Sequence, residues 1–568
     1  MGGRPRLRDH PRLLAGAVGL AVGETVLVWL LAPRSAVALA PQISAPAPYD
    51  VFHDLRWLLV YHESWLGFAG EVLLFLAFRA GVTVLFVRAA WPAQIALPPT
   101  RDLVRRCATS TAVLALVLLP FAVLLFATAV FSLSWLFFVG VPVLVMLAVL
   151  VHQATVERRW WYERPARASV VPILLEFVML TVAGAVLAVA PSPFWVPVAV
   201  LAGAGNAWCW LRVVHAVAGR VRGERTRPFV VVGVGAVLAI VLGGTAIGFA
   251  VSTAFEAARS PIPVARSRTG PPVLVVKGFN SKWDGVTRRW VKGVFRIRRF
   301  SYRGLDDRGE PRSYGRADTH HSIPELVRAM RAQVDAFRRA TGRRVGIVAE
   351  SEGSLVALAY LAATPHAPVR SLVVLSPLLD PGRVYYPTTG DGGWGVAAGT
   401  VLDGISALVH DLGPVDVSSD TPLFRSIVHE GPALRGLLRC PAPGVRELAV
   451  LPIDSGVSAP SPPRIGFPYT VRPAFHGGLL GDGTTADLVA RTLDGHAVPT
   501  SGFWRFTEKV VQAGASPWQV PDLEPSINPP WHGKSATPCP SVRRELRAWI
   551  GAGSSERPSE AASRTSSG

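Results

Sequence analysis

The chain has 568 residues, of which 50% are hydrophobic, and it carries a formal net charge of +19. A single domain usually holds roughly 100 to 200 residues, so at least two structural units are expected. The positive residues are nearly all arginines that cluster beside apolar runs, which is typical of membrane topology. No zinc-finger, RRM or helix–turn–helix pattern occurs, and we expect no nucleic-acid partner.

Seven apolar windows in the first half are long enough to cross a bilayer, which requires roughly 20 mainly apolar residues. They cover residues 13–33, 65–88, 108–131, 135–155, 169–190, 193–216 and 229–254. We therefore predict an all-α transmembrane domain of about seven helices at residues 1–255, followed by a polar linker at 256–272. No clear cleavage site follows the first window, so it is expected to remain as a span.

The segments that connect these windows alternate in arginine content. Arginine clusters precede the first span and follow the second, fourth and sixth, whereas residues 36–63, 132–134 and 191–193 are poor in arginine. By the positive-inside rule the amino terminus is cytoplasmic, and an odd number of spans then leads outside. The arginines that directly follow the last window, at 259, 266 and 268, oppose this only mildly. We expect a multi-pass cell-membrane protein whose C-terminal domain is extracytoplasmic and whose partner is the lipid bilayer.

Four ionisable residues lie within the predicted spans: Glu24, Glu71, Arg79 and Glu176. A charge at bilayer depth is costly, so each should face a partner or a wet cavity. Glu71 and Arg79 lie two turns apart on one helical face. We expect structural interhelical pairing or snorkelling near the interface. A transport or proton-relay role is the alternative, but no broken-helix repeat or ion-site pattern supports it.

The second half alternates short apolar strands with amphipathic helices, which predicts an α/β domain with a mainly parallel sheet at residues 273–551. The expected strands are 273–276, 294–300, 345–349, 371–376, 447–452 and 469–472. The expected helices are 322–340, 354–363, 487–493 and 541–550. The Ser-, Glu- and Arg-rich tail at 552–568 is predicted to be disordered.

Ser351 stands between a buried strand and a helix, in the run Ala349-Glu350-Ser351-Glu352-Gly353. A serine nucleophile needs such a sharp turn, because its hydroxyl must project toward a base and small neighbours must allow close packing. The run is a variant of Gly-x-Ser-x-Gly with Ala349 in place of the first glycine. Here the chain resembles the α/β-hydrolase fold superfamily of lipases and esterases. The alternative is an ordinary strand-to-helix turn with an N-cap serine.

The resemblance implies an oxyanion hole and two partners for the serine. The oxyanion donors would be the backbone N–H groups of Glu352 and of Phe279, the latter in the loop 277–281 after the first strand. The hydrolase order of nucleophile, acid and histidine then points to Asp454 and His476, each of which follows a predicted strand. Asp380 is the alternative acid.

Other histidines lack this strand context, and we expect capping or surface roles for His320 and His321, which precede the serine turn. Residues 383–444 form an insertion too long for a simple loop, and we predict a mobile, partly apolar cap over the site. Such a cap favours an apolar ester substrate. No His-x-x-x-His or Cys-x-x-Cys pair suggests a metal, and we expect no cofactor.

These patterns predict a membrane-anchored serine hydrolase that cleaves carboxylic esters, such as those of lipid or envelope-associated substrates, through an acyl-enzyme on Ser351. Acyl transfer by the same three residues is a close variant, and a non-enzymatic membrane transport or assembly protein with a hydrolase-like domain is the alternative. Cys440 and Cys539 are the two cysteines of the second half, and an extracytoplasmic location would allow them to form a disulfide. The sequence leaves the oligomeric state open.

Overall fold

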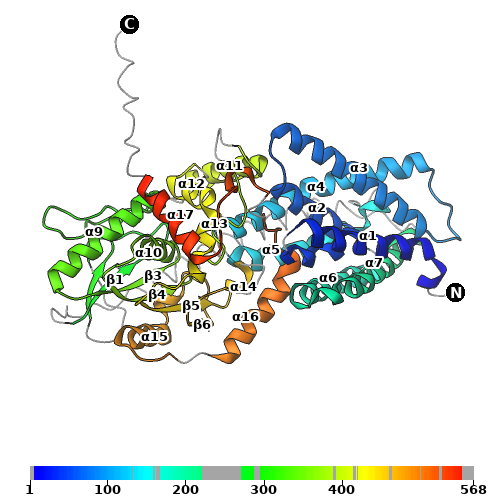
Figure 1. Ribbon diagram of the computed structural model, residues 1–568. Coiled ribbons are helices and arrows are strands. Elements are labelled where there is room, and N and C mark those ends of the chain that lie inside the picture. Colours follow the sequence, from blue (N-terminus) through cyan, green and yellow to red (C-terminus); the bar gives the residue numbers. More distant parts are fainter. Residues whose placement is uncertain are drawn as a thin grey trace, which may run out of the picture.

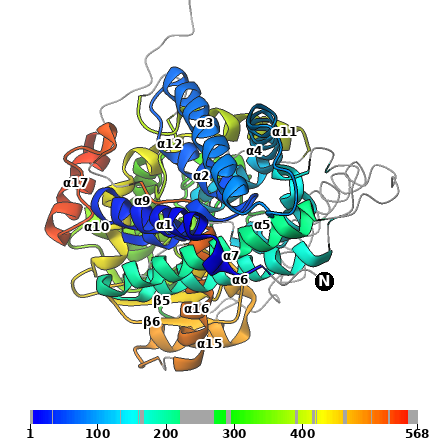
Figure 2. The ribbon, with the colours of Figure 1, turned by 90° about the vertical axis from the view of Figure 1, so that its right-hand side faces the viewer.

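The computed structural model shows a helical bundle at one end of the molecule and a sheet with flanking helices at the other (Figure 1). Figure 2 looks at the bundle from the end that carries the amino terminus. We call residues 11–218 the bundle and residues 270–552 the α/β part. The structure describes residues 5–32, 34–131, 134–157, 160, 165, 167–219, 270–286, 295–387, 392–412, 418, 420–458, 464–498, 501–523 and 527–552.

Five helices in the described residues are long and apolar enough to cross a membrane. They are α1 (Pro11–Leu31), α3 (Trp65–Ala89), α4 (Thr100–Phe131), α6 (Arg167–Val189) and α7 (Trp195–Ala218). Leu30, Leu66 and Leu74 are more than two-thirds exposed on these helices, which is favourable only in contact with lipid. The chain is therefore a membrane protein.

Five of the seven predicted spans are found among the described residues. Helix α5 (Ser134–Val151), within the fourth predicted window, has 18 residues and is not among the five candidate spans. Most of this window is apolar helix, but the regular α-helix ends at Val151 and a short 3-10 turn follows. The seventh window, 229–254, and almost all of the predicted linker lie outside the described residues.

The described parts of the arginine-rich and arginine-poor connectors lie at opposite ends of the bundle. At one end the His10 ring is 2.7 Å from the carbonyl oxygen of Ala89 and packs edge-on against His215. At the other end an apolar cluster joins the end of α1 to the start of α7 through Val28 and Trp195. The α/β part contacts this second end, so the described arginines before α1 and at the start of α4 face away from it.

Residues 36–63 form the first arginine-poor connector, and most of them fold back against the spans. The 3-10 helix η2 (Arg34–Ser44) and helix α2 (Tyr49–Val60) form a hairpin that is buried inside the bundle. Asn206, in the middle of α7, donates to the carbonyl oxygen of Pro41 at 2.7 Å. Neither arm of this hairpin is a 20-residue apolar run, so a search for spans does not detect it.

A polar network inside the bundle joins the hairpin to α1 and α3. His53 lies 2.8 Å from Glu24 of α1 through Nε2 and 2.7 Å from Asp54 through Nδ1. Arg79 of α3 donates to both carboxylate oxygens of Asp54, at 2.6 Å from Nη2, and lies 3.4 Å from Asp50. Arg79 is therefore paired between helices, as the expected structural interhelical pairing requires, and its partners are carboxylates of the buried hairpin.

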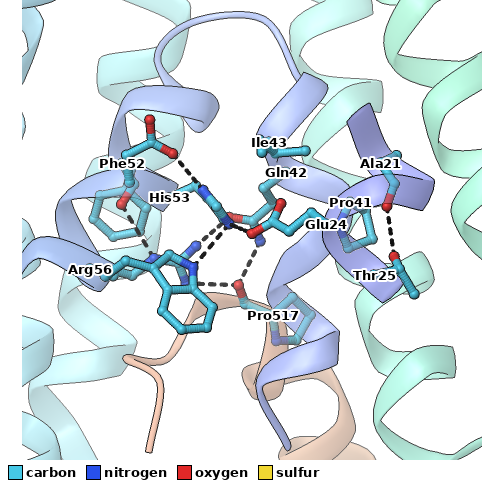
Figure 3. A network of polar contacts seen from close by, with 12 residues as sticks. Ala21, Glu24, Thr25, Pro41, Gln42, Ile43, Phe52, His53, Arg56 and Pro517 are labelled. Carbon is cyan, nitrogen blue, oxygen red and sulfur yellow. Dashed lines mark hydrogen bonds and ion pairs between the residues drawn. The ribbon is translucent and has the colours of Figure 1, made fainter. Parts of the chain in front are cut away.

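The same network holds the α/β part against the bundle (Figure 3). Arg56 donates to the carbonyl oxygens of Pro517 and Gln519, at 2.8 and 2.9 Å, and also to the side chain of Gln42. Gln42 donates to the Pro517 carbonyl at 2.6 Å. Trp518 then stacks on Phe177 of α6, with ring centroids 4.7 Å apart. The segment around Pro517 is thus inserted between helices of the bundle.

The α/β part contains a sheet of six parallel strands in the order β2-β1-β3-β4-β5-β6. They are β1 (Pro272–Val276), β2 (Arg296–Arg299), β3 (Val345–Glu350), β4 (Val369–Leu375), β5 (Arg446–Pro452) and β6 (Tyr469–Arg472). Their Val, Ile and Leu side chains are buried on both faces, as the near-continuous apolar runs predicted. All six predicted strands are confirmed, and each observed strand end lies within two residues of the predicted one.

Helices cover both faces of this sheet. One face carries α9 (Ile323–Thr341), α10 (Glu352–Ala363) and α17 (Cys539–Ala552), and the other carries α15 (Gly483–Asp494). These four helices match those predicted. Helix α16 (Gly502–Ala515), which leads from the sheet to the bundle, was not predicted.

The insertion at 383–444 contains α11 (Val396–Leu412), α12 (Pro422–His429) and α13 (Gly431–Arg435). Helix α11 packs against α2, α3 and α4 of the bundle. At its start, Gly395 N–H donates to the carbonyl oxygen of His62 at 2.6 Å, and Ala397 N–H donates to the His62 ring at 2.8 Å. The described first half of the insertion is thus tied to the bundle, whereas the sequence predicted a mobile lid.

Cys440 and Cys539 form a disulfide, with Cα atoms 5.3 Å apart. The bridge joins residues 99 positions apart, linking the end of the insertion to the start of α17. Removing it with Cys440→Ser should destabilise the α/β part by about 2–5 kcal/mol, because the unfolded chain regains the freedom of a long loop. The measurement is the thermal unfolding midpoint of the purified chain in detergent, with and without reductant.

Reductant should lower the midpoint of the native chain and leave that of Cys440→Ser/Cys539→Ser unchanged. The free thiols, Cys107 and Cys209, are buried in the bundle and provide the control variants Cys107→Ser and Cys209→Ser, which should keep the sensitivity to reductant. If reductant does not change the thermal unfolding midpoint of the native chain, the disulfide does not stabilise it.

Candidate active site

Ser351 occupies a strained turn between β3 and α10. Its backbone has φ 55° and ψ −122°, a conformation that residues other than glycine rarely adopt. Its N–H donates to the carbonyl oxygen of Leu375 at 2.9 Å, which holds the turn over the sheet. Gly353 is required here, because a Cβ at this position would lie 2.7 Å from the carbonyl oxygen of Lys277. The predicted turn is therefore present, with Ala349 accommodated in the strand before it.

The loop after β1 lies directly against this turn. A Cβ on Gly278 would approach the Cβ of Ser351 to 2.8 Å and its Oγ to 3.3 Å. The next residue, Phe279, stacks on His320 with centroids 4.7 Å apart and contacts Phe424 of α12 at 5.3 Å. The two predicted oxyanion donors, Phe279 and Glu352, thus belong to the segments that flank the Ser351 hydroxyl.

His320 was expected to have a capping or surface role, and its position corrects this. It lies in the 3-10 helix η6 (Ala317–His320), where its ring covers Phe279 beside the serine turn. Nothing in the sequence near His320 indicates this contact, because the two aromatic rings are 41 positions apart (320 − 279) and meet only when η6 folds over the loop after β1. The ring of His320 therefore supports the loop after β1.

His476 follows β6, and its Nε2 lies 2.9 Å from the Oγ of Ser351. This distance is that of a hydrogen bond, although the residues are 125 positions apart. The crowded protein surroundings of the imidazole lower the pKa of His476 to about 4. A histidine with this pKa is neutral at pH 7, so its ring nitrogen can accept the serine proton.

Asp454 follows β5, and its Oδ2 accepts the backbone N–H of His476 at 3.1 Å. Burial raises the pKa of Asp454 to about 7, against the opposing effects of this N–H and of the Ser134 hydroxyl. Its Oδ1 is buried with no hydrogen-bond partner in the described residues. The carboxylate therefore positions the backbone of His476, and one of its oxygens is available to a further donor.

Asp380, the alternative acid, lies in a different environment. Its charged neighbours are Asp522 and the arginines 383, 435 and 439. Burial is the main cause that raises the pKa of Asp380, the charge of Asp522 raises it further, and the arginines lower it. No described hydrogen bond joins Asp380 to His476, so the geometry favours Asp454 as the residue that acts with the histidine.

The carboxyl group of Glu352 is buried beside the serine turn, and neither of its oxygens has a hydrogen-bond partner in the described residues. Burial disfavours the charged form and raises the pKa of Glu352 well above its usual range. An ionised carboxylate here would repel a negative charge developing on a bound ester, and the raised pKa favours the form that avoids this repulsion. Glu352 is also the first residue of helix α10.

The bundle also reaches the site, which the sequence did not predict. Ser134, at the start of α5, lies 2.7 Å from the hydroxyl of Ser458, four residues after Asp454. One turn further along α5, Phe138 packs edge-on against Phe475, the neighbour of His476, with centroids 5.9 Å apart. The catalytic candidates thus lie where the α/β part meets the membrane helices.

In the described part of the chain, no group of three or more His, Cys, Asp or Glu side chains could hold a metal ion. The arrangement is instead a hydroxyl, a neutral imidazole and a carboxyl group in succession, which can perform nucleophilic acyl chemistry. Comparisons with protein-family models, curated proteins and solved structures gave no match. The chemistry is therefore argued from the residues and their geometry.

Proposed function

We propose that this chain is a membrane-anchored serine hydrolase that cleaves carboxylic esters. The observation that carries the proposal is the 2.9 Å contact between Oγ of Ser351 and Nε2 of His476, on a serine held at φ 55°. A serine nucleophile requires an adjacent base, and the lowered pKa of His476 keeps its imidazole in the neutral form that can accept a proton. The strained backbone of this turn destabilises the folded state, and a serine with only a structural role would not require it.

In the proposed reaction, the Ser351 oxygen attacks the ester carbonyl carbon while His476 takes the hydroxyl proton. The C–O bond to the alcohol then breaks, and His476 returns the proton to the departing alkoxide, which leaves an acyl group on Ser351. Water attacks this acyl-enzyme by the same steps and releases the acid. Asp454 supports the imidazolium through its carboxylate, and Oδ1 is the acceptor available for a ring N–H.

The negative charge on the carbonyl oxygen would be stabilised by backbone N–H groups of Glu352 and Phe279. Support comes from the position of the loop after β1, which touches Ser351 at Gly278, and from the start of α10 at Glu352. Preorganised donors of this kind usually account for a large share of the rate of acyl transfer. The raised pKa of the Glu352 carboxyl group is compatible with this role.

We also propose that the α/β part is an α/β-hydrolase domain with a cap. Support comes from the chain order, in which the serine follows β3, the acid follows β5 and the histidine follows β6, with the insertion after β4. Helix α12 of the insertion touches Phe279 through Phe424, so this part of the cap borders the site. Acyl transfer to another alcohol or an amine would use the same residues, and product analysis separates it from hydrolysis.

The test is covalent labelling with a fluorescent fluorophosphonate in purified membranes. The native chain should be labelled, and Ser351→Ala should not, because the reagent attaches to an activated serine oxygen. The matched control is Ser313→Ala, which removes an exposed serine of the same α/β part and should retain the label. Equal labelling of Ser351→Ala and the native chain would refute the proposal.

We further propose that the α/β part is extracytoplasmic. It contacts the end of the bundle opposite the described arginines before α1 and at the start of α4, and arginine-rich connectors are expected in the cytoplasm. Alkaline phosphatase fused after Gly270 should therefore be active, because the enzyme needs an oxidising compartment for its disulfides. A fusion within residues 90–99, at the opposite end of the bundle, should be inactive. The reverse pattern would contradict the assignment.

A further inference from the structure

Helix α16 has its polar and apolar faces reversed relative to a helix that faces water. Phe503, Phe506 and Val510 are 67%, 66% and 53% exposed, whereas Glu508 and Gln512 are 1% and 4% exposed. At 3.6 residues per turn, the three apolar side chains fall within about 60° of one another, on the side opposite Glu508 and Gln512. A helix on a water-soluble surface shows the opposite arrangement.

The inward polar face of α16 packs on the turn that carries Asp454. A Cβ on Gly456 would lie 2.8 Å from the carbonyl oxygen of Glu508 and 2.9 Å from the N of Gln512, so the two backbones are in close contact. The hydroxyl of Ser455 donates to Oε1 of Glu508 at 3.4 Å. The inward face of helix α16, which does not include Phe503, Phe506 or Val510, is therefore in contact with the turn that follows Asp454.

The carboxyl end of α16 enters the bundle. Pro517, two residues after the helix, would touch a Cβ on Gly184 of α6 at 2.5 Å, and Trp518 donates to Thr181 of α6 at 2.9 Å. Helix α16 itself packs along α6, and Figure 1 shows it leading obliquely from the end of the bundle to β6. One end of α16 is thus held at the level of a membrane span.

The apolar face of α16 continues the lipid-facing surface of α6. Val182 and Val189 of that span are 56% and 68% exposed, as expected where a helix meets hydrocarbon. A second exposed apolar pair lies beside His476. Phe475 is 56% exposed and packs against Phe138 of α5, which is 42% exposed. Lipid around α6 would therefore be in contact with α16 as well.

We infer that α16 lies in the lipid–water interface with Phe503, Phe506 and Val510 buried in the leaflet. The ester cleaved at Ser351 is then the bond that joins an acyl chain to a lipid of that leaflet. This inference rests on the proposed function and names its substrate class. The bilayer covers this apolar face, because α16 packs along the span α6 and the residues that follow α16 are inserted between bundle helices. The lipid reaches the serine along α16 without crossing water.

The first experiment locates the helix without relying on activity. A cysteine at position 506 carries an environment-sensitive NBD fluorophore in nanodiscs, and a cysteine at position 286 serves as control, since Val286 is 52% exposed elsewhere on the α/β part. The native chain supplies the background from its buried thiols. NBD at 506 should show blue-shifted emission and quenching by doxyl-labelled lipid, and NBD at 286 should show neither. A water-like spectrum at 506, or a blue shift that lipid does not quench, would overturn the inference, the latter indicating contact with a second copy.

The second experiment measures turnover. The variant Phe503→Ser/Phe506→Ser/Val510→Ser should hydrolyse a phospholipid in nanodiscs at least about tenfold more slowly than the native chain, since membrane contact scales with buried apolar area. Its turnover of a soluble short-chain ester and its fluorophosphonate labelling should be unchanged, and Val286→Ser should match the native chain in every assay. Equal loss on both substrates would overturn the inference. A native chain that neither labels nor cleaves the soluble ester would instead refute the proposed function, while the fluorophore result stands separately.

Discussion

Replacing Ser351 by Ala should lower kcat/KM for a soluble ester by a factor on the order of 10⁴ or more, because the acyl-enzyme can no longer form. His476→Ala should cause a similar loss, since its Nε2 is the group within 2.9 Å of the serine hydroxyl. The two changes should not add, and the double variant should be scarcely slower than either single variant. The measurement is steady-state turnover of a chromogenic short-chain ester by the purified protein in detergent.

The carboxylates provide a further arm of this experiment. Asp454→Asn should reduce turnover less than the serine change does, because it removes charge and positioning rather than the nucleophile. Asp380→Asn should have a smaller effect, since Asp380 lies among arginines. The exposed residue His366 supplies the control His366→Ala, which should be fully active. Additive losses for Ser351 and His476 would argue against a catalytic unit, and greater damage from Asp380→Asn would reject Asp454 as the acid.

The second large effect concerns the stability of the bundle. Arg79→Leu should lower the free energy of unfolding by about 3–5 kcal/mol, because it leaves buried carboxylates without their counter-charge. Arg79 is fully buried and donates to Asp54, to Asp50 and to the carbonyl oxygen of Ile43. The measurement is a denaturant titration of the purified chain in mixed micelles.

Two control variants lie on the same helix. Arg88→Leu removes an exposed arginine at the end of α3 and should change stability by about 0.5 kcal/mol or less. Glu71→Gln should be similarly mild, because Arg79 is paired with other carboxylates. Combining Arg79→Leu with Asp54→Asn should recover part of the loss and give a coupling energy above about 1 kcal/mol. If Arg79→Leu is no worse than Arg88→Leu, the buried ion network does not stabilise the bundle.

Local sequence patterns were sufficient for the α/β part. Runs rich in Val, Ile and Leu identified the four central strands, because parallel strands inside a sheet are buried on both faces and lack alternation. The two edge strands, β2 and β6, are more polar and only partly buried. The run from Ala349 to Gly353 indicated a strand, a sharp turn and a helix. The structure has this sharp turn at Ser351, whose φ is positive. Chain order then selected Asp454 and His476, whose proximity the structure supports.

The interior of the bundle was predicted less well, because its decisive contacts are between residues distant in sequence. Hydropathy identifies a helix that faces lipid along its length, but η2 and α2 face other protein on all sides. The cost of a charge in a span indicated that Arg79 needs a partner, but helical periodicity constrains only neighbours on the same helix. The hairpin supplies that partner as Asp54.

The sequence by itself determined a membrane half, a parallel α/β half and a serine on a strand-to-helix turn, since each of these follows from composition and short-range spacing. Only the tertiary structure decided that the two halves are interlocked, that α11 is held by the bundle and that His320 covers the loop beside the serine. It also decided the environment of α16. Its Phe, Val, Glu and Gln residues fit any amphipathic helix, and which face points inward depends on the packing of Gly456 and α6 against it.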